Sequence, residues 1–148
     1  MSLIEKLEAD LKDAMRSRDP VRRETIRNIR GTIRNREIER GQTLDDDGVM
    51  QLIRSLVKQR IDSIEQYAAA GRDELVQKEA AEKAILESYL PAAPAPAEIE
   101  RVVREVIAEV GAAGPKDIGR VMKPALARLG PAADGKVVSE TVKRLLSR

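Results

Sequence analysis

The sequence contains no cysteine and no histidine, and its only aromatic residues are Tyr67 and Tyr89 among 148 residues. Without cysteine, the chain cannot form disulfides, thiolate nucleophiles or cysteine–zinc sites. Without histidine, it lacks the usual general base of serine hydrolases and the usual side chain of a pH switch. The shortage of aromatic rings also argues against a platform on which unpaired RNA bases stack.

Long apolar segments are absent as well. No run approaches the roughly 18–20 apolar residues that cross a bilayer, and the first residues lack the apolar core of a secretion signal. The missing cysteines fit a reducing compartment. From these features we expect a cytoplasmic protein that does not associate with membranes.

The sequence predicts no metal site and no cofactor. The run Asp45-Asp46-Asp47-Gly48 superficially suggests a calcium loop, but the twelfth position, where such a loop needs glutamate, is Leu56. The glycines form no phosphate-binding loop, and the serines have no histidine partner. We therefore identify no catalytic residue and expect no catalysis by the chain alone.

Helical periodicity runs through the whole sequence and predicts an all-α fold of about seven helices. Residues 91–97 contain three prolines, so they form a linker between an N-terminal bundle of about four helices (1–90) and a C-terminal three-helix module (98–148). Asp19-Pro20 predicts the start of the second helix and Thr43 the cap of the third. Pro124 predicts a kink or an early break in the sixth helix.

Charge is distributed unevenly, although 27 basic and 25 acidic residues leave a net charge of only +2. Residues 1–40 carry a net charge of +3 and residues 116–148 a net charge of +5, whereas the segments between them are acidic. The two basic ends are therefore the places to look for a binding surface.

The second helix concentrates arginine on one side. At about 100° per residue, its arginines share a stripe about 60° wide. The stripe consists of Arg23, Arg27, Arg30 and Arg34. Arginine suits phosphates or the carboxylates of a partner because its planar fork makes paired hydrogen bonds. The alternative is a solvated face whose arginines pair with acids of the third or fourth helix.

The C-terminal module has the second basic surface, on its last two helices. A basic helical surface of this kind can dock on phosphates. The basic side chains of this surface are Lys116, Arg120, Lys123, Lys136, Lys143 and Arg144.

An ordered set of short motifs resembles the GatB/YqeY family over nearly the whole chain. The motifs are Leu3-Ile4-Glu5-Lys6-Leu7 with Met15, Arg27-Asn28-Ile29-Arg30, Lys58-Gln59-Arg60 with Asp62-Ser63, Ala70-Gly71-Arg72 with Leu75, Glu79 with Tyr89-Leu90-Pro91, Lys116 to Met122, and Ala133 to Val138. Pro124 departs from the family pattern.

The resemblance implies a helical bundle followed by a small three-helix module, like the tail of the B subunit of aspartyl/glutamyl-tRNA amidotransferase, which helps to hold tRNA. Carried over to this sequence, it implies an RNA-facing set of Lys116, Gly119, Arg120, Lys123, Gly135 and Lys136, together with Asp134, whose role is better explained as a helix cap.

Three functions are compatible with this sequence. The first is a tRNA-binding accessory module that recognises RNA shape and phosphates. The second is a protein-interaction adaptor for an aminoacyl-tRNA synthetase or an amidotransferase, which binds through the arginine stripe. The third is carbon–nitrogen ligase activity with glutamine as the amido-N donor. That activity is the usual family label, but the chain has no amidase or kinase machinery of its own.

Overall fold

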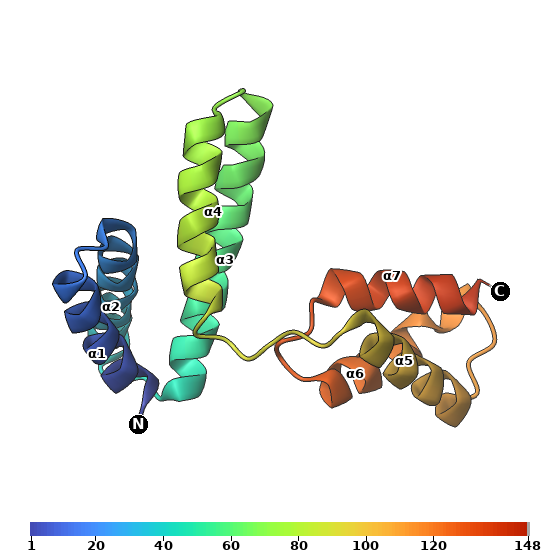
Figure 1. Ribbon diagram of the computed structural model, residues 1–148. Coiled ribbons are helices and arrows are strands. Elements are labelled where there is room, and N and C mark those ends of the chain that lie inside the picture. The colour runs from blue at the N-terminus through green and yellow to red at the C-terminus, as the bar shows by residue number, and fades with distance from the viewer. Residues whose placement is uncertain (148) are drawn as a thin grey trace. The chain divides into compact units, whose positions relative to one another are not determined.

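The computed structural model describes residues 1–147, and these residues form an all-helical structure, which confirms the predicted fold class. Within these residues there are seven α-helices, which Figure 1 labels, and one short 3₁₀ helix. The helices are α1 (Leu3–Arg16), α2 (Pro20–Arg40), α3 (Asp46–Ala69), α4 (Asp73–Glu87), α5 (Pro96–Val110), η1 (Pro115–Asp117), α6 (Ile118–Leu129) and α7 (Gly135–Leu146). None of these helices is long and apolar enough to cross a membrane.

Local capping explains most helix boundaries. The Asp19 carboxylate accepts a hydrogen bond from the Arg22 backbone N–H at 3.1 Å and Pro20 opens α2, as predicted. The predicted Thr43 cap of α3 is wrong. Asp45 is the cap instead, because its carboxylate accepts the Gly48 N–H at 2.8 Å.

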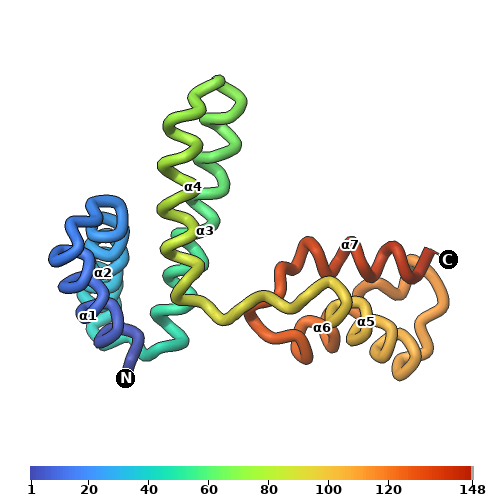
Figure 2. The backbone as a smooth tube through the Cα atoms, in the orientation of Figure 1, coloured from blue at the N-terminus to red at the C-terminus, as the bar shows by residue number. Residues whose placement is uncertain are grey.

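The chain divides into two compact units, Met1–Leu90 and Pro91–Arg148, each with its own apolar core (Figure 2). In the first unit, α1 and α2 pack against the hairpin of α3 and α4. Fully buried Leu7, Ile26, Ile29 and Ile53 lie at the centre of this core. The buried residues of α3 end at Leu56, although the helix continues to Ala69.

The outer half of the α3–α4 hairpin is held together differently. Arg60 of α3 lies between two glutamates of α4, with its Nε 2.9 Å from Glu82 and 3.4 Å from Glu79. All three side chains are at least four-fifths buried, so the low local polarity strengthens their attraction. This charged cluster follows the apolar core along the hairpin and links α3 to α4 by ion pairs.

The second unit is a three-helix module. Its core consists mainly of valines from α5 and α7 and of Val121 and Ala125 from α6. Helix α5 already begins at Pro96, so the last two residues of the expected linker belong to the helix, where proline fits the first turn.

The predicted break at Pro124 does not occur, because α6 runs through to Leu129. Proline removes one backbone donor from the helix interior. Burial of Val121 and Ala125 on one face of α6 stabilises the helix on both sides of that position.

Candidate RNA-binding and partner-binding surfaces

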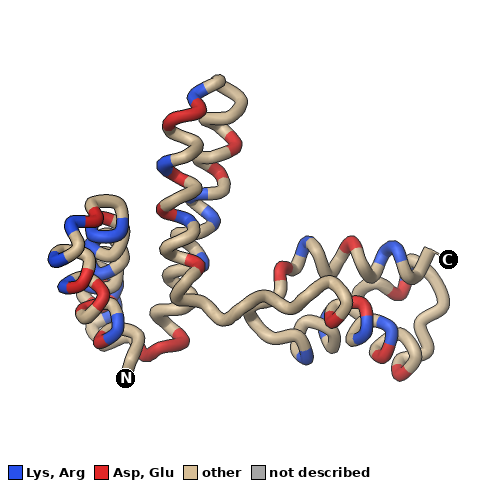
Figure 3. Tube along the Cα trace, in the orientation of Figure 1, with Lys and Arg blue, Asp and Glu red and all other residues tan. Residues whose placement is uncertain are grey.

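The predicted RNA-facing residues all lie at the surface of the C-terminal unit. Lys116 is in η1, Lys123 is on α6, and Lys136 and Lys143 are seven residues apart on α7. A rise of 1.5 Å per residue places the last two about 10 Å apart along the helix. Gly119 and Gly135 are exposed, and an added Cβ would meet nothing within 4 Å at either position. The set is therefore spread over η1, α6 and α7, and Figure 3 shows lysine or arginine on both α6 and α7.

Two arginines of this set already have partners within the unit. The Arg120 guanidinium donates to the Val110 carbonyl at 2.6 Å and lies 3.4 Å from Asp117. The Arg144 guanidinium lies 3.4 Å from Glu100 of α5. By contrast, no carboxylate of the described residues lies within 4.0 Å of the four lysines Lys116, Lys123, Lys136 and Lys143.

Two aspartates of the unit have local structural roles. The Asp117 carboxylate accepts the Ala113 backbone N–H at 3.0 Å, and this hydrogen bond is the main cause that lowers the Asp117 pKa. Asp134 accepts the Lys136 N–H at 2.9 Å and so caps α7, as predicted. Both carboxylates fix the loops around α6 and are engaged with backbone donors.

The arginine stripe of α2 finds its partners elsewhere than expected. Arg23 and Arg27 share the Glu24 carboxylate, at 3.0 and 3.2 Å, on their own helix. Arg30 lies 3.7 Å from Glu8 of α1, and Arg34 has no carboxylate of the described residues within 4.0 Å. The expectation that acids of the third or fourth helix would pair with the stripe is therefore wrong, since α1 is the neighbour of this face.

A groove runs between α1 and α2 along this stripe. It has a volume of about 360 Å³ and is bordered by Arg27, Arg30 and Arg34. Its apolar lining consists of partly exposed Ile4 and of Leu7 and Ile33, which are only 0% and 5% exposed and so offer a ligand almost no surface. The groove thus combines three guanidinium groups with one partly exposed aliphatic side chain, that of Ile4.

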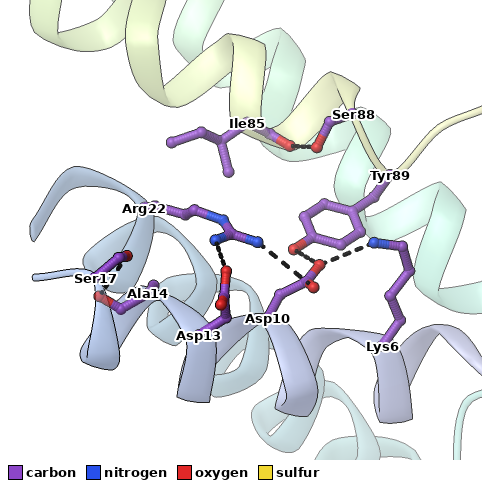
Figure 4. Close-up of polar contacts among 9 residues, drawn as sticks. All are labelled: Lys6, Asp10, Asp13, Ala14, Ser17, Arg22, Ile85, Ser88 and Tyr89. Atoms are coloured by element: carbon purple, nitrogen blue, oxygen red, sulfur yellow. Dashed lines mark hydrogen bonds and ion pairs between the residues drawn. The ribbon is translucent and has the colours of Figure 1, made fainter. Parts of the chain in front are cut away.

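Sequence reasoning missed a polar cluster that joins the end of α4 to α1 (Figure 4). The Tyr89 hydroxyl donates to Asp10 at 2.6 Å, and the Lys6 ammonium donates to the same carboxylate at 2.9 Å. Arg22 lies 3.5 Å from Asp10 and 2.7 Å from Asp13. Lys6 also lies 5.0 Å from the centre of the Tyr89 ring, where it is attracted to the ring face. The one signal for this cluster in the sequence was that Tyr89 is one of only two tyrosines.

The pKa values in this cluster follow from burial and hydrogen bonding. Burial, followed by the hydrogen bond to Asp10, raises the pKa of Tyr89 well above its ordinary value, so the hydroxyl stays protonated. Burial alone would raise the pKa of Asp10, but hydrogen bonds from Tyr89 and Lys6 outweigh it and lower the pKa below 3.8. The cluster therefore holds a neutral Tyr89 hydroxyl against an ionised Asp10 carboxylate, which suits a structural role.

We predict that Asp10→Asn destabilises the first unit at neutral pH by about 1–2 kcal/mol, because asparagine offers no charge to Lys6 and Arg22. The folded pKa of Asp10 is lowered, so its stabilisation is complete above the ordinary value of 3.8 and is lost as the pH falls through the folded pKa. Urea unfolding of wild type and variant at several pH values should show the difference shrinking in acid. A difference that is constant across pH, or that exposed Asp62→Asn reproduces, would contradict this prediction.

The fold and these surfaces define a class of small helical protein with a four-helix unit, a three-helix unit and exposed basic surfaces on both. Residues 4–146 match the family described as Yqey-like protein, and the chain belongs to this family. The resemblance that the sequence motifs indicated is thereby confirmed.

Curated relatives include the protein named altered inheritance of mitochondria protein 41, mitochondrial. The chain is 37% identical to the protein of that name from Lachancea thermotolerans over 112 residues, which cover 74% of this chain and 60% of the relative. It is 42% identical to the Kluyveromyces lactis protein over 89 residues, which cover 60% of this chain and 48% of the relative. The chain thus spans only about half of the length of these relatives.

The expected cytoplasmic location is contradicted by these relatives, which are named as mitochondrial proteins. That expectation depended on the absence of cysteine and of long apolar runs. The absence of cysteine bears on redox conditions, and the absence of long apolar runs bears on membrane insertion. Neither feature distinguishes the cytoplasm from the interior of an organelle.

Proposed function

We propose that the chain is a tRNA-binding accessory module that recognises the shape and phosphates of folded RNA through its C-terminal unit. One observation carries this proposal: in the segment 116–148, which has a net charge of +5, four exposed lysines of η1, α6 and α7 lie beyond 4.0 Å from any carboxylate of the described residues. Lysines without an internal counterion are available to replace the counterions around phosphates.

The chemistry of the unit supports recognition of the RNA backbone. Both tyrosines of the chain lie in the first unit, so the C-terminal unit has no ring on which an unpaired base could stack. An extended surface of lysines fits a row of phosphates along folded RNA better than it fits one splayed nucleotide. Arg120 and Arg144 contribute less, since each already has a partner in its own unit.

The test is binding of the full chain to a folded tRNA transcript at several salt concentrations. We predict that replacing Lys116, Lys123, Lys136 and Lys143 with alanine lowers affinity at least about tenfold and reduces the slope of log K against log salt by about one per lysine. Alanine at three exposed lysines of the first unit, Lys12, Lys58 and Lys78, is the control and should change little.

Three results would overturn the proposal. They are no binding at low salt, equal affinity for a random single strand, and an equal loss of affinity in the control variant. The circular dichroism of each variant checks that its helices are intact, since all the replaced side chains are exposed.

A further inference from the structure

The groove between α1 and α2 carries more positive charge than its own carboxylates can neutralise. Glu24 is shared by two arginines, and Glu8 lies 3.7 Å from Arg30, beyond a good hydrogen bond. Glu37, which also lines the groove, accepts the Leu44 backbone N–H at 2.8 Å. Arg34 therefore faces the groove without a carboxylate partner among the described residues, and the groove favours an anionic ligand.

Gly31 supplies a second, independent observation. It lies in the middle of the 21-residue helix α2, where glycine is among the least favourable residues for helix formation. An added Cβ would meet nothing within 4 Å, so packing inside the chain gives no reason for glycine at this position. Gly31 lines the groove between the arginines, and a missing side chain there lets another backbone approach closely.

From these features we infer that the groove binds an acidic amphipathic helix of a partner protein. Its carboxylates would meet Arg27, Arg30 and Arg34, its backbone would cross at Gly31, and an aliphatic side chain beside the carboxylates would pack on partly exposed Ile4. The three arginines are spaced i, i+3 and i+7, so they extend over about 10 Å of α2 and match carboxylates at the same spacing on one helix face.

Open Gly31 and partly exposed Ile4, both beside the arginines, favour a helix over RNA as the occupant. A phosphate backbone carries charge but has no aliphatic surface to bury, whereas an amphipathic helix presents carboxylates and aliphatic side chains side by side. The inference goes beyond the proposed RNA binding, because it uses a different unit of the chain and different residues.

The experiment titrates the isotopically labelled full chain with a synthetic helical peptide of about 16 residues, a length that is helical in isolation when rich in alanine. The peptide carries glutamate at i, i+3 and i+7 and leucine beside them. A second peptide has the same composition in scrambled order. We predict that amide shifts concentrate on the residues of the groove and that the scrambled peptide binds at least about tenfold more weakly.

Two variants with a matched control sharpen the test. Arg34→Glu is expected to weaken binding about tenfold, and a peptide with lysine in place of the facing glutamate should restore it. Arg40→Glu makes the same charge change on the same helix outside the groove and should leave binding within about twofold. Gly31→Leu should raise the melting temperature through better helix propensity and yet abolish binding.

Three outcomes would overturn the inference. Shifts spread over the whole chain would indicate nonspecific charge attraction, and undiminished binding by Gly31→Leu would exclude close backbone approach. Displacement of the peptide by tRNA, together with loss of tRNA binding in Arg34→Glu, would assign the groove to RNA. Because the four lysines of the C-terminal unit remain intact in these variants, failure here leaves the proposed RNA surface to be judged by its own test.

Discussion

Val103→Asp is expected to unfold the C-terminal unit while the N-terminal unit stays folded. Val103 is 0% exposed in the middle of the valine core of α5, α6 and α7. A carboxylate at that position has no cation beside it, and burying it costs several kcal/mol. A unit of this size has a total stability of only roughly 3–9 kcal/mol, so one buried charge removes most of it.

The prediction that only one unit unfolds follows from the two separate cores. No residue of the first core is shared with the second, and residues 91–95 join them without helical structure. We expect amide signals of residues 98–147 to collapse towards unfolded positions, while signals of residues 1–90 keep their dispersion. Val137→Asp, at a valine that is 40% exposed, is the matched control and should leave both units folded.

The same variant separates the two binding activities. Val103→Asp should lose tRNA affinity at least as completely as the four-lysine variant, because an unfolded unit no longer holds the lysines in fixed positions. It should bind the acidic peptide like the wild type, because the groove belongs to the other unit. A single transition in which both units unfold together would contradict their independence. Unchanged tRNA binding would contradict the location of the RNA surface.

Periodicity and capping predicted the helices well because they depend on neighbours in sequence. The positions of proline, glycine and aspartate set the start of α2 at Pro20 and the cap of α7 at Asp134. The Thr43 cap was wrong for a reason that lies outside the segment. The Leu44 N–H donates to Glu37 at 2.8 Å, and Leu44 packs against the core, so Asp45 becomes the cap and the helix begins only at Asp46.

Burial was harder to predict than helix, since it depends on the lengths of the packing partners. The sequence predicts one continuous apolar stripe along α3, yet Ile61 is 39% exposed. Helix α3 has 24 residues and α1 only 14, so they measure about 36 and 21 Å, and the shorter helix cannot cover the longer one. Met15 of α1 is 52% exposed although the adjacent Ala14 is fully buried, so the core reaches only one side of the last turn of that helix.

For the charged side chains, sequence spacing predicts which of them share a helix face, whereas tertiary packing determines which groups they contact. The sequence predicts that the arginines of α2 share one face, because 3.6 residues per turn fixes their directions. It could not tell that α1 borders this face or that a groove forms between the two helices. Likewise, the spacing exposes Arg120, but only the fold brings the Val110 carbonyl within 2.6 Å of its guanidinium.

Tyr89→Ala is expected to be the most damaging single truncation in the N-terminal unit. Tyr89 is 6% exposed, belongs to the first core, and donates its hydroxyl to Asp10, 79 residues earlier in the chain. Truncating a buried aromatic ring to alanine costs about 3–5 kcal/mol through lost burial and the cavity that remains. Losing the hydroxyl also deprives the Asp10 carboxylate of one of its donors.

Two comparisons divide this cost between ring and hydroxyl. Tyr89→Phe keeps the ring and removes only the donor, so it should cost about 1 kcal/mol in urea unfolding. Tyr67→Ala, in the outer half of the hairpin where the ring is only half-buried, should cost much less than Tyr89→Ala. If Tyr89→Phe were as damaging as Tyr89→Ala, the polar cluster would be the main interaction that holds the end of α4 against α1. If neither changed the unfolding midpoint, the closure of the unit would depend on the aliphatic core alone, since Leu86 one turn earlier is fully buried.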